Sequence, residues 1–201
     1  MPDPQEIYAR LREAYPAIGI LKRPSSRPFA GVTLHDPVGN FFHLSYERLD
    51  RRMDVYADAA LQGASHRRRI HHFQLRVMDA PAIARFYRDV FELTELPQDA
   101  GDPSHYLTDG VVTMIITPWR IEDFGVSNAE APAMDHLGFA VESIDQFAAD
   151  LERLANRNYA LAPKRPRAGE SECRMELLAT CRYGGFQFGD PDGILLEVVQ
   201  D

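Results

Sequence analysis

The chain has 201 residues, enough for one or two domains, and its 45% hydrophobic content is enough for a packed core. The formal net charge of -8 argues against general binding of nucleic acid. No apolar run approaches the roughly 18 residues needed to span a bilayer, and the first residues do not resemble a signal peptide. We therefore expect a cytoplasmic protein with neither membrane nor nucleic-acid partners.

Residues 1–50 predict a helix followed by three strands. Asp3 is a candidate N-cap and Pro4 suits the first helical position. Strand-like stretches follow at residues 17–22, 29–34 and 40–46. We interpret this segment as a partial αβββ module, joined by an arginine-rich connector over residues 51–69. Its sheet would leave an edge exposed, so we expect it to pair with the rest of the protein or with a second subunit, as in a homo-oligomer.

Residues 70–118 predict a strand, a helix and three further strands. Asp79 is a candidate N-cap for the helix, whose apolar residues recur at helical spacing. Because strand side chains alternate between faces, the opening strand 70–77 should present three polar side chains away from its packing face. These are His72, Gln74 and Arg76, and the closing strand 111–117 should present Thr113, Ile115 and Thr117 toward the same cavity.

Residues 135–201 repeat this plan. The opening strand 135–141 places His136 on a face whose other residues are small, and Ser143 with Gln146 forms a capping-box pattern. The turn Asp36-Pro37-Val38-Gly39 recurs as Asp190-Pro191-Asp192-Gly193, which indicates an internal repeat. The final strand, 193–199, is apolar on both faces except for Glu197.

The carboxylate of Glu197 is costly among aliphatic side chains unless it is paired or bound to a cation. His72 and His136 also point away from the apolar faces of their strands. Two imidazoles and one carboxylate form the ligand set of mononuclear non-haem Fe(II), with open positions for oxygen or substrate. Manganese, zinc or nickel would accept the same ligands. The alternative is that the three are hydrogen-bonded core residues of a protein without a metal.

Four features together resemble the vicinal oxygen chelate superfamily. They are the repeated βαβββ units, the opening-strand histidines, the helix sequence Phe86-Tyr87-Arg88-Asp89-Val90-Phe91 and the terminal Asp-Pro-Asp-Gly-x-x-x-Glu. This group includes glyoxalase I, extradiol dioxygenases, methylmalonyl-CoA epimerase and the bleomycin resistance proteins. The resemblance implies an α+β fold in which paired modules, 70–118 and 135–201, form a half-open barrel over residues 70–201. It also implies that His72, His136 and Glu197 are the metal ligands.

Within the superfamily, glyoxalase I and the epimerase use a fourth ligand at a place that Ile115 occupies here. The resemblance to a three-ligand site therefore implies a Fe(II) extradiol-type dioxygenase acting on a catechol-like aromatic or other vicinal-oxygen substrate. Two alternatives remain open. One is a glyoxalase-like isomerase or lyase that uses a divalent metal without oxygen, and the other is a metal-free binding or resistance protein.

The acid-base groups of those dioxygenases have no equivalent in this chain. Their histidine falls on Val111 or Val112, and their tyrosine falls on Gln187. Candidate catalytic residues are His105, Tyr106 and Gln187, and strand alternation can direct only one of the first two into the cavity. Expected substrate contacts are Gln74, Arg76, Thr113 and Thr117, although Arg76 could equally neutralise acidic neighbours. We expect His71 to face away from His72.

Overall fold

The computed structural model describes residues 4–18, 20–21, 32–44, 68–121, 133–162, 186–190 and 194–200. Its contacts divide the chain into two compact units. Unit 1 contains Met1–His66 with Arg85–Leu93, and unit 2 contains Arg67–Ala84 with Thr94–Asp201. None of the described helices is long and apolar enough to cross a membrane.

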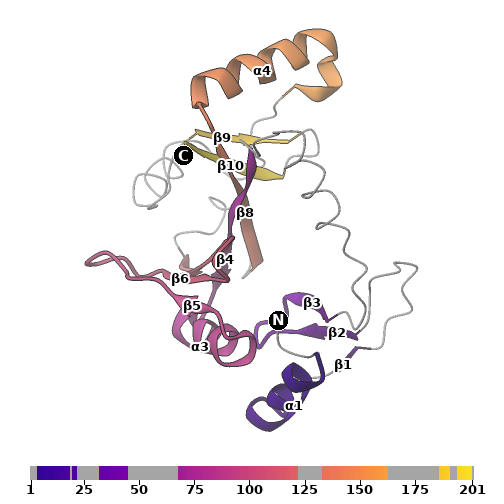
Figure 1. The fold of residues 1–201 in the computed structure, drawn as a ribbon, viewed down its shortest axis with the longest axis vertical. Helices are drawn as coiled ribbons and strands as arrows, with labels where there is room; N and C mark the ends of the chain where they lie inside the picture. Colours follow the sequence, from indigo (N-terminus) through magenta and orange to yellow (C-terminus); the bar gives the residue numbers. More distant parts are fainter. Residues whose placement is uncertain are drawn as a thin grey trace, which may run out of the picture. The chain divides into compact units, whose positions relative to one another are not determined.

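Unit 2 is built on a seven-stranded mixed sheet with the order β5-β6-β7-β4-β8-β10-β9 (Figure 1). The two long central strands are β4 (Arg69–Val77) and β8 (Ala133–Val141). The other strands are β5 (Thr94–Glu95), β6 (His105–Thr108), β7 (Thr113–Pro118), β9 (Phe186–Gly189) and β10 (Leu195–Gln200).

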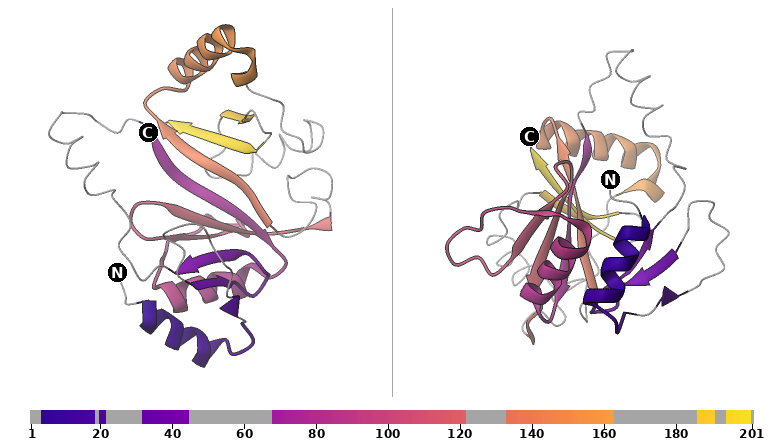
Figure 2. Two further views of the ribbon diagram at one scale, coloured as in Figure 1. Left: turned by 90° about the vertical axis from the view of Figure 1, so that its right-hand side faces the viewer. Right: turned by 60° about the horizontal axis from the view of Figure 1, so that its bottom comes forward.

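Each module closes by pairing its last strand in parallel with its first. β7 pairs in parallel with β4, and β10 pairs in parallel with β8. The two modules join through the antiparallel pair of β4 and β8, so that β4, β8 and β10 run side by side (Figure 2). The described strands end at β5 and β9 without closing a ring. The predicted α+β class with paired modules in a half-open arrangement is therefore confirmed.

The helices over residues 80–91 and 144–157 begin at their predicted caps, whereas Asp3, the cap predicted for the first helix, lies outside the described residues. α3 (Ala80–Phe91) follows Asp79, whose Oδ1 accepts a hydrogen bond from the backbone N–H of Ala82 at 3.0 Å. α4 (Ile144–Arg157) follows Ser143, whose Oγ accepts from the N–H of Gln146 at 3.2 Å. These side chains satisfy N–H groups that the first helical turn leaves without a partner in the helix. A short 3-10 helix, η2 (Tyr159–Leu161), follows α4.

The β6–β7 turn is longer than the sequence pattern indicates. β7 begins at Thr113, two residues later than predicted. The Oδ1 of Asp109 accepts the N–H groups of Val111 and Val112, both at 2.9 Å. Gly110 has a φ of 92°, a backbone conformation that glycine adopts without strain. The turn therefore uses the N–H groups of Val111 and Val112, which a β7 strand beginning at Val111 would need for pairing.

Unit 1 contains α1 (Pro4–Ala14) and a three-stranded sheet in the order β1-β2-β3. The strands are β1 (Ile20–Leu21), β2 (Val32–His35) and β3 (Phe41–Leu44). This order matches the predicted helix followed by three strands. The Oδ1 of Asp36 accepts from the N–H of Asn40 at 2.8 Å, and the Oδ1 of Asp190 accepts from the N–H of Ile194 at the same distance. The two turns predicted as repeats therefore have the same hydrogen bond.

The core of unit 1 is aromatic and includes the C-terminal part of α3. Phe42 packs against Phe91 with ring centroids 5.2 Å apart, and Tyr15 packs edge-on against Phe86 at 4.9 Å. The buried Tyr87 donates its hydroxyl proton to Oδ2 of Asp36 at 3.1 Å. The turn aspartate is fully buried, so this bond satisfies one of its oxygens.

Three predictions about organisation stay predictions. They are the domain boundaries at residues 50 and 69, the homo-oligomer and the cytoplasmic location. Most of the connector predicted over residues 51–69, up to Arg67, lies outside the described residues.

Candidate metal centre

One row of residues crosses the sheet of unit 2 from β7 to β9. Register partners along this row are Thr113, His72, Gly138, Glu197 and Gln187. Residues that face each other on adjacent strands direct their side chains to the same side of the sheet. His136 shares this side because it pairs with Gln74, two residues along β4 from His72. Strand register therefore brings the three predicted ligands to one face.

The donor atoms of His72, His136 and Glu197 all lie within 4.8 Å of one another, and the three residues are buried. Nε2 of His72 is 3.1 Å from Nε2 of His136, which is 3.4 Å from Oε2 of Glu197. Nε2 of His72 is 3.9 Å from Oε1 of Glu197. Ligands about 2.1 Å from one metal at octahedral or tetrahedral angles lie roughly 3.0–3.4 Å apart. The distances of 3.1 and 3.4 Å fall in this range, and the 3.9 Å distance exceeds it by about 0.5 Å. The chemistry of the donors suits a divalent cation, which the three residues could hold after a small shift of His72 or Glu197.

Gly138 makes room for the imidazole of His72. A Cβ atom built on Gly138 would lie 2.1 Å from Cε1, 2.3 Å from Nδ1 and 2.4 Å from Nε2 of His72. The ring therefore lies across the backbone of the neighbouring strand, on the side of β10 and Glu197. Any larger residue at position 138 would compete with the ring for this space.

Two β-bulges place supporting residues beside the two candidate ligand histidines. The β4–β8 register shifts between Ile70 and His72, which inserts His71, and again where Asp135 is inserted opposite the step from Gln74 to Leu75. A bulge adds a residue to one strand and redirects its side chain, and bulges are common beside functional sites. Each inserted residue immediately precedes a ligand histidine.

Asp135 holds the ring of His136. Its Oδ2 lies 2.8 Å from Nδ1 of His136, and its Oδ1 accepts a hydrogen bond from Nε of Arg76 at 3.2 Å. A carboxylate at this distance fixes the proton on Nδ1, so the lone pair of Nε2 points toward the other donors. Arg76 is itself buried, and its charge compensates that of Asp135.

His71 holds the ring of His72 in the same way. Its Nδ1 lies 2.9 Å from Nδ1 of His72, and the two rings meet edge to face. The prediction that His71 faces away from His72 is wrong, because strict alternation fails at the bulge. Burial, followed by the neighbouring imidazoles of His136 and His71, lowers the pKa of His72 to about 3. At neutral pH this ring is uncharged, which is the form that binds metals.

Glu197 is oriented by Gln187, whose Nε2 donates to Oε2 of Glu197 at 2.7 Å.

The model of the Glyoxalase/Bleomycin resistance protein/Dioxygenase superfamily matches residues 69–198, which include all three candidate ligands. The chain belongs to this superfamily. A search of the curated proteins found no significant match.

Solved structures that resemble this chain have low sequence identity to it, and the first two below share its fold. BphC, a halotolerant catechol dioxygenase, is 14% identical, with a TM-score of 0.50 over 98% of this chain and 63% of that one. A fusion of a xylose isomerase-like TIM barrel with a 4-hydroxyphenylpyruvate dioxygenase is 15% identical, with a TM-score of 0.52 over 98% and 36%. A Streptomyces coelicolor methylmalonyl-CoA epimerase is 18% identical, with a TM-score of 0.41 over 66% and 96%.

The predicted substrate contacts share the face of the candidate metal ligands. Gln74 pairs with Ile115 in the strand register, and Arg76 pairs with Thr117. Arg76 is engaged by Asp135, and Oγ1 of Thr117 lies 3.0 Å from Oγ of Ser104. Thr113, the fourth predicted substrate contact, borders a cavity.

The catalytic candidates fall on different faces. Tyr106 pairs with Ile115 and so shares the face of the ligands, where its hydroxyl donates to Asp102 at 2.6 Å. His105 lies on the opposite face, and its Nδ1 is 2.8 Å from Oε1 of Glu95. Gln187 belongs to the ligand row and contacts Glu197.

Sequence reasoning missed the roles of His71 and Asp135. A usable signal was present, because each ligand histidine directly follows a residue that can bind an imidazole Nδ1. Because this pattern occurs on both opening strands, it indicates that His71 and Asp135 orient the histidines that follow them.

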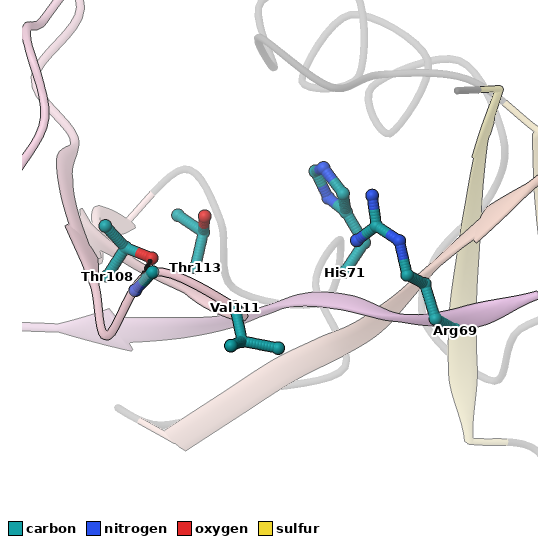
Figure 3. Close-up of a pocket in the computed structure, with 6 residues that line it drawn as sticks. Arg69, His71, Thr108, Val111 and Thr113 are labelled. Carbon is teal, nitrogen blue, oxygen red and sulfur yellow. Dashed lines mark hydrogen bonds between the residues drawn. The ribbon is translucent and has the colours of Figure 1, made fainter. Parts of the chain in front are cut away.

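A cavity of about 360 Å³ lies between β4 and the end of the β6–β7 hairpin (Figure 3). It is lined by Arg69, His71, Thr108, Gly110, Val111 and Thr113. Because Thr113 neighbours His72 in the ligand row and His71 contacts the His72 ring, the cavity reaches the edge of the candidate metal site.

Proposed function

We propose that the protein is a metal-dependent enzyme, a mononuclear Fe(II) extradiol-type dioxygenase acting on a catechol-like aromatic. The observation that carries the proposal is the convergence of His72, His136 and Glu197 on one buried face. Two histidines and one carboxylate leave coordination positions for a substrate and oxygen, which is the arrangement typical of Fe(II) oxygenases. A bound metal would act as a Lewis acid and as a template for the substrate.

The residues around the ligands would keep this site in one geometry. Asp135 fixes the tautomer and orientation of His136, and Gln187 orients the carboxylate of Glu197. Ile115 lies on the same face but offers no donor atom, which favours three protein ligands over the four of a glyoxalase-like isomerase or lyase. Tyr106 is the candidate acid-base group on this face.

A metal-free binding protein is the second candidate, and one observation favours it. The contacts from His71 through His72 and His136 to Asp135 form an unbroken chain of hydrogen bonds. Such a chain satisfies the imidazoles without a cation. In that protein the cavity would hold an aromatic ligand without transforming it.

Anaerobic loading with Fe(II), followed by exposure of a panel of catechols to oxygen, tests the proposal. We expect a coloured ring-opened product from at least one catechol, and none from the Glu197→Gln variant loaded in the same way. Turnover of carbonyl substrates by the zinc or nickel form without oxygen would favour the isomerase instead. Failure to bind Fe(II), Mn(II), Zn(II) or Ni(II) tightly would favour the metal-free binding protein.

A further inference from the structure

Two buried polar side chains on the face of the candidate metal ligands have no hydrogen-bond partner among the described residues. They are Gln74 on β4, which is 5% exposed, and Thr113 on β7, which is 9% exposed. Buried polar groups almost always have a partner, and an exception calls for an explanation. We propose that this amide–hydroxyl pair binds a neutral oxygen of the substrate. The proposal rests on the proposed function and deepens it, because it narrows the substrate class.

The structure separates the amide–hydroxyl pair from the other two predicted substrate contacts. Arg76 donates to Asp135, and Oγ1 of Thr117 lies 3.0 Å from Oγ of Ser104. Each of these side chains therefore has a polar contact within the protein. Within the described part of the chain, no such contact involves the amide or the hydroxyl of the pair. A bound substrate would supply the hydrogen bonds that the fold does not.

Gln74 lies beside both candidate ligand histidines. It is two residues from His72 along β4, and its register partner on β8 is His136. Thr113 is the register partner of His72 on β7, so it is a diagonal neighbour of Gln74. Two residues of strand rise and one strand spacing put the Cα atoms of such neighbours about 8 Å apart. One ligand oxygen between the two side chains would be within reach of both.

The ring of His72 does not come between the two groups. It lies over Gly138 of β8, where an added Cβ would be 2.1 Å from Cε1, and β8 and β7 flank β4 on opposite sides. Thr113 also lines the cavity between β4 and the β6–β7 hairpin (Figure 3). A substrate held at the metal would therefore extend a further group over β4 toward Thr113.

The chemistry of the amide–hydroxyl pair selects a neutral oxygen. A glutamine amide offers donors at Nε2 and an acceptor at Oε1, and a threonine hydroxyl both donates and accepts. Neither group carries a charge that would offset an anion. The vicinal oxygens of a catechol would bind the metal, which leaves the pair for a third oxygen, a hydroxyl or a carbonyl. The substrate class is thus a catechol-like aromatic with a third, neutral oxygen function.

Binding of pyrogallol and of catechol to the full-length chain loaded with Zn(II) tests the pair, without oxygen so that neither ligand is oxidised. Both ligands chelate a metal, and pyrogallol adds the third hydroxyl. Wild type should prefer pyrogallol. Gln74→Met and Thr113→Val should each reduce this preference roughly fivefold, the typical effect of one hydrogen bond, at unchanged catechol affinity. Pyrogallol can chelate through either of its hydroxyl pairs, but this advantage is equal in every variant.

Gln146→Met is the matched control, because it removes an exposed amide on α4 whose Nε2 donates to Asp150. It should leave the preference for pyrogallol unchanged. The metal-free Gln74→Met chain should unfold in urea at an equal or higher midpoint, because the substitution removes no hydrogen bond between described residues. A lower midpoint would mean that the amide stabilises the fold, and it would count against the proposal.

Three results would overturn the proposal. They are a preference that persists in Gln74→Met, an equal loss in Gln146→Met, and a fall in the Zn(II) affinity of Gln74→Met, which would make Gln74 a metal ligand instead. The same titrations on the metal-free chain separate the two proposals. A chain that binds no divalent metal but prefers pyrogallol through Gln74 would refute the proposed function and keep the pair. A chain that binds Zn(II) and catechol without preferring pyrogallol would do the reverse.

Discussion

The contact between Gly138 and His72 yields the sharpest prediction, for the Gly138→Ala variant. The added Cβ would lie 2.1 Å from Cε1 of His72, whereas ordinary contacts begin at 3.4 Å, so the ring must move by about 3.4 − 2.1 = 1.3 Å. The ring is fully buried between His71 and His136, so this movement disturbs packed neighbours. We expect the metal-free variant to lose roughly 1–3 kcal/mol of unfolding free energy, as overpacked cores do.

Metal affinity should fall much further than stability. Metal sites tolerate errors of about 0.2 Å in ligand distance. A ring displaced by about 1.3 Å removes His72 as a ligand, so we expect at least a roughly 100-fold loss of affinity for Zn(II) or Fe(II), the upper end of losses from disturbed ligand support. Competition with a chelator of known affinity measures this loss.

A double-mutant cycle with His72→Ala separates this cause from a general effect on the strand. Without the imidazole, the alanine methyl at position 138 fills vacated space and stiffens the strand. Gly138→Ala should then be neutral or stabilising by roughly 0.5–1 kcal/mol. The coupling energy should be on the order of 2 kcal/mol from urea unfolding of the four metal-free proteins. Additive effects within 0.5 kcal/mol would refute the reasoning.

Asp135→Asn should lower metal affinity roughly 10–100-fold in chelator competition, because the amide holds the proton on Nδ1 of His136 less strongly. Glu197→Gln should abolish tight metal binding, yet the metal-free variant should unfold at an equal or higher temperature, because a buried carboxylate becomes a neutral amide. Tyr87→Phe should lower the unfolding free energy by roughly 1–3 kcal/mol in urea, because buried Asp36 loses a hydrogen bond. For wild-type protein in free metal at about 100 times the dissociation constant, adding a chelator should lower the unfolding free energy by about 2.7 kcal/mol.

Exposed positions provide matched controls for these changes. Asp145→Asn, on the exposed surface of α4, should leave metal affinity unchanged. Tyr159→Phe, at a side chain that is 90% exposed, should leave the unfolding free energy within about 0.5 kcal/mol of wild type. The roles assigned to the buried groups would be contradicted if Asp145→Asn matched Asp135→Asn in metal affinity or Tyr159→Phe matched Tyr87→Phe in stability. Unaltered stability after chelation would contradict them as well.

Local pattern was sufficient to predict much of the fold. The caps at Asp79 and Ser143 and the faces of the ligand strands follow from backbone geometry within a few residues. The choice between His105 and Tyr106 required the register of β6 against β7, which places Tyr106 beside Ile115. Register depends on pairing between strands, and no residue pattern within β6 alone specifies which face becomes the site.

The sequence by itself determined which side chains are available as ligands, because alternation along a strand is a local property of the backbone. Only the tertiary structure decided that Asp135 and His71 leave this alternation, since a bulge exists only relative to a partner strand. It also decided that the ring of His72 lies over Gly138, two residues whose contact depends on the pairing of β4 with β8. The candidate metal centre is therefore encoded locally in its donors and non-locally in the geometry that brings them together.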